Sequence, residues 1–232
     1  DQFVFMAAHD LRPPANAIKW GLSSLRTEQP ELVKKSADLL SIIDRGNERL
    51  LRLVEDMLEV ARIENHTIAI KLEEVAIAAL IPEVESDLQS LADREGVTLC
   101  FELENDLPLV EGDTIRLKEV LLALLTSTIK YSNKGDSITV SSKVSGTTVT
   151  VSVKAENMIL SPEDQSHIFE KFPESSTMYD NDETGLGLFI AKQLLALMSG
   201  TIECTSSKEK GTVFSFSLRR ADTEKTPINL KK

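Results

Sequence analysis

A single histidine beside an acid, followed by two prolines, marks the start of this 232-residue chain, in the stretch Phe5-Met6-Ala7-Ala8-His9-Asp10-Leu11-Arg12-Pro13-Pro14. The surrounding apolar residues recur at helical spacing, which places the histidine on a long helix. The proline pair is expected to kink that helix just below His9, because proline removes a backbone hydrogen bond and clashes with the preceding turn. Working outward, residues 1–64 read as two long helices joined by a turn at residues 27–30, with Pro30 leading into the second helix.

The second of these helices carries residues in two rows that repeat every seven positions. One row is Val33, Leu40, Asn47, Val54 and Ala61, and the other is Ser36, Ile43, Leu50, Met57 and Glu64. Further leucines and isoleucines widen the apolar face beyond a single coiled-coil seam. A helix that is apolar over such a width needs more than one neighbour, as in a four-helix bundle. Two helices cannot supply this alone, so we expect a homodimer.

After residue 66 the pattern changes to short strand-like runs mixed with helices. Strands are predicted at residues 67–72, 97–103, 137–144, 148–154, 201–206 and 212–218, and helices at residues 77–94, 113–131 and 184–198. Gly146 lies between two predicted strands, as expected of a hairpin turn. This order predicts an α+β sandwich, with helices on one face of a mixed sheet. The polar residues 221–232 predict a disordered tail.

The composition excludes several classes of function. A net charge of −11 argues against a nucleic-acid partner, which would need a basic face. No run approaches the ~20 apolar residues that span a bilayer, and no signal peptide is visible. Because the chain begins with Asp1 inside a helical pattern, we expect a piece of a longer protein, with any sensor domain or membrane anchor upstream. Cys100 and Cys204 lie in strand-like runs without metal-type spacing, which predicts buried free thiols in a reducing compartment.

The stretch around His9 resembles the phosphoacceptor box of sensor histidine kinases of two-component systems, which usually reads His-Glu-Leu-Arg-Thr-Pro or has Asp in second place. The resemblance continues in register to about residue 219. It implies a dimerisation and phosphoacceptor domain at residues 1–65 and a catalytic, ATP-binding domain of the GHKL type at residues 66–220. It also implies the cytoplasmic portion of a sensor that would reach a membrane only through an upstream region.

The resemblance gives His9 the role of phosphate acceptor. In the family the neighbouring acid acts on the histidine during autophosphorylation, and Asp10 matches that acid. The chemistry agrees, because phosphoryl transfer needs a neutral imidazole nitrogen and an acid that orients the ring or accepts its proton. Arg12 is predicted to contact phosphate oxygens. The alternative is a solvated histidine on a bundle surface. Pro13 stands where the family commonly has Thr or Asn to position water for dephosphorylating the partner regulator, so we expect no phosphatase activity by that route.

The resemblance also implies a site for ATP and Mg²⁺, of which part is kept. The family has Asn at the positions of Ala123 and Ser127, and the second Asn helps to hold Mg²⁺, so Ser127 is at most a weak metal ligand. The matches to residues that contact phosphate and nucleoside are Lys130 and Tyr131. The family's glycine loop, whose backbone N–H groups are predicted to receive phosphate, is kept as Thr184-Gly185-Leu186-Gly187-Leu188.

The adenine-recognition box is the most altered part. The run Leu160-Ser161-Pro162-Glu163-Asp164 anchors the register, which places the family's base-binding Asp at Ala155 and its two glycines at Asn157 and Ile159. A shift of one residue would instead put Glu156 near the Asp position, with the glycines still missing. Alanine cannot bond adenine, and a β-branched residue does not suit the positive φ that glycine allows. The expected lid at residues 173–182 is polar and glycine-free, and Glu183 replaces a glycine beside the phosphate path. These departures predict impaired ATP binding.

Three functions follow from this pattern. The first is a degenerate kinase, or pseudokinase, that dimerises and either regulates or takes phosphate from a response regulator receiver domain or another histidine kinase. The second is an active, divergent kinase that autophosphorylates His9 and transfers the phosphoryl group to a response regulator Asp. The third is a non-catalytic dimer scaffold. We predict the first, because phosphate flow through His9 needs no ATP pocket.

Overall fold

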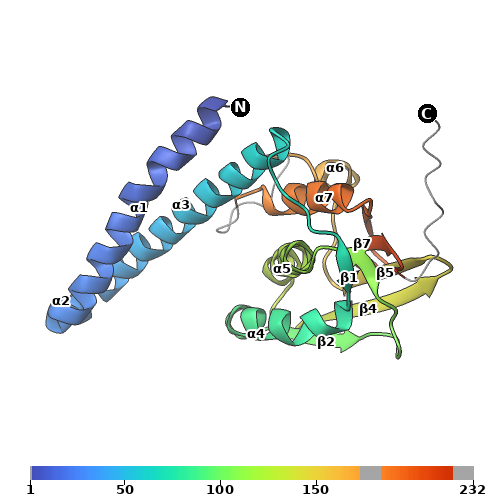
Figure 1. The fold of residues 1–232 in the computed structure, drawn as a ribbon. Helices are drawn as coiled ribbons and strands as arrows, with labels where there is room; N and C mark the ends of the chain where they lie inside the picture. The colour runs from blue at the N-terminus through green and yellow to red at the C-terminus, as the bar shows by residue number, and fades with distance from the viewer. Residues whose placement is uncertain (1, 173–183, 222–232) are drawn as a thin grey trace, which may run out of the picture.

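The computed structural model describes residues 2–172 and 184–221, which form a helical hairpin followed by an α/β sheet domain (Figure 1). The hairpin consists of α1 (Gln2–Glu28), the short α2 (Pro30–Lys35) and α3 (Ala37–Glu64). Proline is tolerated at the first position of α2, because a backbone N–H at that position would have no acceptor within the helix. The expected second long helix is interrupted at Ser36, whose backbone ends α2 and starts α3. Helix α1 continues through both of its prolines.

Small residues let the two long helices of the hairpin approach each other. Ala8 and Ala15 are each 1% exposed, and Ala8 packs with the buried Val54 and Leu58 of α3. Near the turn, Arg26 of α1 pairs with Asp44 of α3 at 2.6 Å. Several large apolar side chains nevertheless remain exposed on the hairpin: Leu11, Ile18, Trp20, Leu32, Leu39, Ile42 and Ile43.

The second domain is built on a five-stranded sheet in the order β2-β4-β5-β7-β6. Its strands are β2 (Thr98–Glu102), β4 (Ser137–Ser145), β5 (Thr148–Ala155), β6 (Thr201–Ser207) and β7 (Gly211–Arg219). Only β2 and β4 are parallel, so the sheet is mixed as expected. A separate small sheet pairs β1 (Glu73–Val75) with β3 (Val110–Gly112).

Helices α4 (Ile77–Glu95), α5 (Thr114–Tyr131) and α7 (Gly187–Leu197) cover one face of the main sheet, and the short α6 (Pro162–His167) lies beside α7 (Figure 1). The core between helices and sheet includes Leu117, Leu121 and Leu124 of α5 and Phe214 and Phe216 of β7, each at most 1% exposed. The alternation of buried and half-buried residues along β5 confirms the period-two pattern of the sequence. The predicted fold class is therefore confirmed for the described part of the chain.

The strand predicted at residues 67–72 is wrong. Those residues form no strand, and the first strand begins only at Glu73. Ile68 and Ile70 do pack against the core, and the Lys71 backbone N–H donates to the Asp113 carboxylate at 2.8 Å. The segment is thus a linker that lies on the domain without a partner strand. The predicted tail at 221–232 lies outside the described residues from residue 222 onward.

The structure bears on two expectations from the composition, which concern the cysteines and membrane-spanning helices. Both cysteines are free, as predicted, but they are half-buried and not fully buried. Burial raises the pKa of the Cys204 thiol to about 12, so this thiol stays protonated at neutral pH. Within the described ranges, no helix has the length and apolarity needed to cross a membrane.

Candidate functional site

The predicted acceptor His9 lies on the open surface of α1. Its side chain is 69% exposed, and that of Asp10 is 79% exposed. The His9 Nδ1 and Asp10 Oδ1 atoms are 3.2 Å apart. When the carboxylate accepts the Nδ1 proton, the lone pair of the neutral ring is on Nε2, which is the nitrogen that can attack a phosphorus atom. The arrangement matches the one that acceptor chemistry requires.

Arg12, which was predicted to contact phosphate, is half-buried in the hairpin, whereas His9 is exposed. It follows Ala8 by one helical turn and precedes Ala15, and both alanines are buried. The Arg12 side chain is half-buried, and its Nε atom is buried without a hydrogen-bond partner among the described residues. The two amide atoms of the buried Asn47 on α3 share this condition. Arg12 therefore runs along the inner side of α1, and its role at phosphate remains a prediction.

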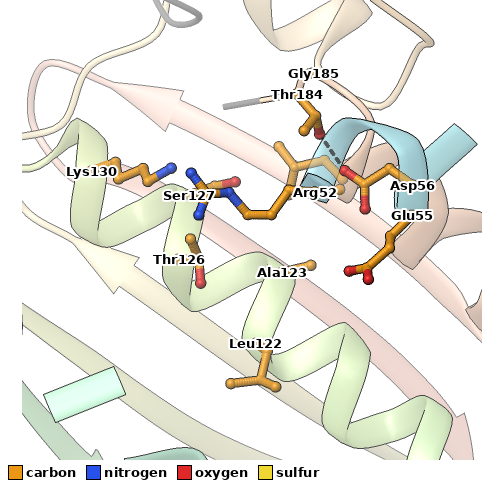
Figure 2. A pocket seen from close by; sticks show the side chains of 12 residues that line it. Arg52, Glu55, Asp56, Leu122, Ala123, Thr126, Ser127, Lys130, Thr184 and Gly185 are labelled. Carbon is orange, nitrogen blue, oxygen red and sulfur yellow. Dashed lines mark hydrogen bonds between the residues drawn. The ribbon is translucent and has the colours of Figure 1, made fainter. Parts of the chain in front are cut away.

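A cavity of about 240 Å³ lies where α3 of the hairpin meets α5 and the glycine loop of the second domain (Figure 2). Six of the predicted nucleotide-site residues line it: Ser127, Lys130, Thr184, Gly185, Gly187 and Leu188. Two predicted residues do not line it, namely Tyr131 and the buried Leu186. We call this cavity the phosphate pocket, because its glycine loop precedes the N-terminus of α7, which is a favourable place for an anion.

Helix α3 adds three residues to the phosphate pocket that the sequence did not indicate. They are Arg52, Glu55 and Asp56, and Figure 2 shows Arg52 pointing toward the side of α5 that carries Ser127 and Lys130. At the sequence level these three were charged residues on the polar face of a predicted bundle helix. These three residues line the pocket because α3 of the hairpin packs against α5 and the glycine loop of the second domain.

Asp56 closes one side of the phosphate pocket. The Thr184 hydroxyl donates a hydrogen bond to the Asp56 carboxylate, and the same hydroxyl accepts from the Leu186 backbone N–H at 3.3 Å. Burial raises the pKa of Asp56 above its ordinary value, with a further rise from Glu55, while the Thr184 bond and Arg52 act in the opposite direction. A carboxylate is thus held on the first residue of the loop that is predicted to bind phosphate.

Two ion pairs accompany this contact between the domains. Glu59 of α3 pairs with Arg116 of α5 at 2.7 Å, and Glu64 at the end of α3 pairs with Lys171. Arg116 also pairs with Glu119 at 2.8 Å, and both Arg116 and Glu59 are 19% exposed. We use the term docked arrangement for this placement of α3 against α5 and the glycine loop.

The residues at the positions predicted for adenine recognition make contacts within the protein. Ala155 is fully buried at the end of β5, paired with Thr212 of β7. The Thr212 hydroxyl donates to the Met158 carbonyl at 2.7 Å and also bonds the Ser206 hydroxyl at 2.7 Å. Asn157 donates to the buried Asp136 at 2.6 Å.

The turn after β5 also differs from one built on glycine. Among the described residues with positive φ, neither Asn157 nor Ile159 appears, so the backbone there does not adopt the conformation that glycine would favour. The backbone of β7 does approach the end of β5 closely at Gly211, where a Cβ atom would come within 2.2 Å of the Ala155 carbonyl oxygen. The predicted lid at 173–182 and Glu183 lie outside the described residues.

The residues present fit a phosphate chain better than they fit adenine or Mg²⁺. Lys130, Arg52 and the glycine loop offer positive charge and N–H donors. Ser127 provides one hydroxyl, and the cations Arg52 and Lys130 lie next to it, whereas the two carboxylates of the pocket, Glu55 and Asp56, come from α3. Across the described residues, no group of three or more acidic, histidine or cysteine side chains is arranged to hold a metal.

Asp56 makes the stability of the docked arrangement depend on pH. An acid whose pKa is raised by folding binds more protons in the folded state than in the unfolded state, in the interval between its ordinary pKa of 3.8 and the raised value. Stability therefore falls as pH rises through that interval. We expect Asp56→Asn to raise the unfolding temperature at neutral pH, because the amide oxygen still accepts from Thr184 without a buried charge.

The measurement is the difference in unfolding temperature between Asp56→Asn and the wild type across the pH range. This difference should be largest above the raised pKa and should vanish as pH falls toward 3.8. Asp93→Asn is a matched control, because Asp93 is exposed and its carboxylate accepts from Gln89 on the protein surface. A difference that does not change with pH would contradict the assignment.

Two family models match separate parts of the chain. Residues 1–66 match the His Kinase A (phospho-acceptor) domain, HisKA. Residues 112–222 match the family described as histidine kinase-, DNA gyrase B-, and HSP90-like ATPase, HATPase_c. The peroxide stress-activated histidine kinase mak1 of Schizosaccharomyces pombe is 28% identical over 99% of this chain, which spans only 14% of that protein.

Solved structures show the same fold. Full-length ShkA, in complex with AMPPNP, superimposes with a TM-score of 0.78 at 24% identity, over 95% of this chain and 46% of that one. The histidine kinase ThkA, in complex with the response regulator protein TrrA, has a TM-score of 0.66 at 26% identity, over 95% of this chain and 61% of that one. At these identities the first comparison bears on the fold alone.

Proposed function

Because this chain is a two-component histidine kinase core, with a phosphoacceptor domain followed by an ATPase domain, we propose that it accepts and relays phosphate on His9 while its own ATP binding is impaired. The domain boundary is proposed at residues 65 and 66. The observation that carries the impairment is the buried Ala155 at the position of the base-binding Asp, beside a Thr212 already bonded to Met158 and Ser206. This pseudokinase-like role is our proposal for the whole protein.

The acceptor step uses His9 and Asp10. The Nε2 lone pair attacks the phosphorus of a phosphorylated donor, so that a P–N bond forms and the P–O bond to the donor breaks, with its electron pair leaving on the donor oxygen. Asp10 holds the Nδ1 proton and stabilises the positive charge that develops on the ring. The exposure of both side chains leaves the ring open to a large protein donor.

The proposed partner is the receiver domain of a response regulator, as donor or as acceptor of the phosphoryl group. Support comes from the similarity to ThkA, which was solved in complex with a response regulator protein. A second histidine kinase is the alternative donor. We also propose a homodimer, because the apolar side chains Leu39, Ile42 and Ile43 stay exposed on α3.

Calorimetry with ATP tests the impairment directly. We expect Mg·ATP binding weaker than about 10 μM, because losing a charged hydrogen bond to the base costs ~1.5–3 kcal/mol, or roughly a tenfold to hundredfold loss of affinity. Adding Mg²⁺ should change the affinity little, since the Ser127 hydroxyl is a weaker metal ligand than the Asn that the family has there.

Restoring the family residues is the matching gain-of-function test. The combined variant Ala155→Asp, Asn157→Gly, Ile159→Gly and Ser127→Asn should bind Mg·ATP more tightly than the wild type. Each single restoration should do little, because the base and metal contacts act together. Wild-type affinity tighter than about 10 μM, or ready autophosphorylation from labelled ATP, would refute the proposal.

A further inference from the structure

A second cavity, of about 220 Å³, lies beside the phosphate pocket, between α3, α4 and α5. Its lining residues are Arg45, Glu48 and Arg52 of α3, Leu91 and Arg94 of α4, and Thr126 and Lys130 of α5. We call this cavity the basic cleft. It gathers four cationic side chains against a single carboxylate, in a chain whose net charge is −11.

The positive charge of the basic cleft is only partly neutralised by the protein. The side chains of Arg45 and Arg52 have no hydrogen bond and no ion pair with any described residue, although Arg52 lies close enough to Asp56 to lower its pKa. Arg94 pairs with Glu95 through its Nε atom at 3.0 Å, and a guanidinium has four further N–H donors. Like charges gathered in this way repel one another, so an anion between them lowers the electrostatic energy.

The chemistry of the lining indicates which anion. Guanidinium groups present planar forks of N–H donors that match the oxygens of phosphate, and Lys130 adds a compact positive charge. A volume of about 220 Å³ is below the ~300–1,000 Å³ of sites for larger organic ligands. We propose that the basic cleft binds a compact phosphate-bearing anion of the size of a phosphate or diphosphate group.

The position of the basic cleft couples this anion to the docked arrangement. Arg45 and Arg52 come from the hairpin, whereas Arg94 and Lys130 come from the sheet domain. A ligand that bridges both sets binds the docked arrangement in preference to any other and therefore stabilises it. The cleft thus acts as an anion-dependent lock between the acceptor domain and the ATPase domain.

The basic cleft can be tested apart from the phosphate pocket. The two cavities share Arg52, Thr126 and Lys130, but Arg45 and Arg94 line the cleft alone. A failure of the ATP experiments would therefore leave this proposal untouched. Arg49 offers a matched control, because it is an exposed arginine on the same helix that lines neither cavity.

The experiment is calorimetry of the whole chain with sodium pyrophosphate, without Mg²⁺ and at constant ionic strength. The wild type and Arg49→Gln should bind pyrophosphate with equal affinity, and their unfolding temperatures should rise on binding. The double variant Arg45→Gln with Arg94→Gln should bind at least about tenfold more weakly, because it loses two charged donors. Its unfolding temperature in sodium chloride alone should equal or exceed that of the wild type, since both side chains are exposed and their loss relieves repulsion between cations.

Inorganic phosphate and ADP, also without Mg²⁺, identify the source of the phosphate group. Tighter binding of ADP than of pyrophosphate, with the same loss in the double variant, assigns the cleft to the phosphate end of a nucleotide. The reverse order assigns it to a free phosphate anion. The proposal is overturned if the wild type does not bind pyrophosphate at millimolar concentration, or if the double variant binds as well as Arg49→Gln.

Discussion

Replacing His9 by glutamine should abolish phosphorylation of this chain by a phosphorylated receiver domain or by an active histidine kinase. Glutamine retains polarity but has no nucleophilic ring nitrogen, so the loss should be complete. The fold should be unaffected, because the His9 side chain is 69% exposed and, among the described residues, bonds only its neighbour Asp10. The measurement is transfer of labelled phosphate, with the label expected to be labile in acid and stable in base.

His167→Gln is the matched control for this experiment. His167 is also exposed and also adjoins a carboxylate, that of Glu170 at 2.9 Å, yet it lies on α6 in the other domain. Labelling of His167→Gln should equal that of the wild type. Asp10→Asn should slow labelling by about a hundredfold, because an amide cannot take the ring proton. Wild-type labelling of the His9 variant would remove the acceptor assignment.

Charging the exposed apolar face of α3 should convert a dimer into a monomer. Leu39 and Ile42 are 65% and 58% exposed, so they contribute little to the packing of the hairpin itself. In the proposed dimer they are covered, and each unpaired charge buried there costs about 3–5 kcal/mol. The double variant Leu39→Glu with Ile42→Glu should therefore sediment with half the mass of the wild type at micromolar concentration.

The choice of residues matters in this test. Leu50 occupies a heptad position, but it packs with Ala8, Val54 and Leu58, so a charge there would damage the hairpin itself. Leu72→Glu with Ile115→Glu is the control, since it places the same charges on exposed aliphatic positions outside the hairpin. A wild-type chain that sediments as a monomer would contradict the dimer, as would a double variant that stays dimeric.

Periodicity in the sequence predicted the helical and sheet layers of this fold, but it did not predict correctly which segments pair as strands. The alternation in β4, β5 and β7 has partner strands on both sides, and those strands were predicted within one or two residues. At residues 67–72 the same alternation places Ile68 and Ile70 on the core, but no strand lies alongside. An alternating pattern reports which side chains are buried, and it cannot report whether the backbone finds a partner.

The candidate site divides in a similar way. Ser127, Lys130 and the glycine loop were predicted because they lie in local motifs, and the structure brings them to one cavity. Arg52 and Asp56 were missed because their place depends on how two domains meet, which no local pattern encodes. Arg45 and Arg94 were missed for the same reason, being ordinary surface cations until α3 and α4 face each other.

The unpaired linker between the hairpin and the sheet domain sets how far the two can separate. Eight residues, 65–72, connect the end of α3 to the start of β1, and at ~3.3–3.6 Å per extended residue they reach roughly 26–29 Å. A helix with its side chains is only ~10–12 Å across. Ala8, the neighbour of His9, packs on Val54 and Leu58, and Arg52 and Asp56 from the same stretch of α3 line the phosphate pocket. The linker is long enough to span the helix, so contact and not tether length holds the ATPase domain against α3. Val60 and Ile63 of α3 are buried in the core of that domain, and Ile68 and Ile70 of the linker pack on it. Asp56, Glu59 and Glu64 add polar contacts.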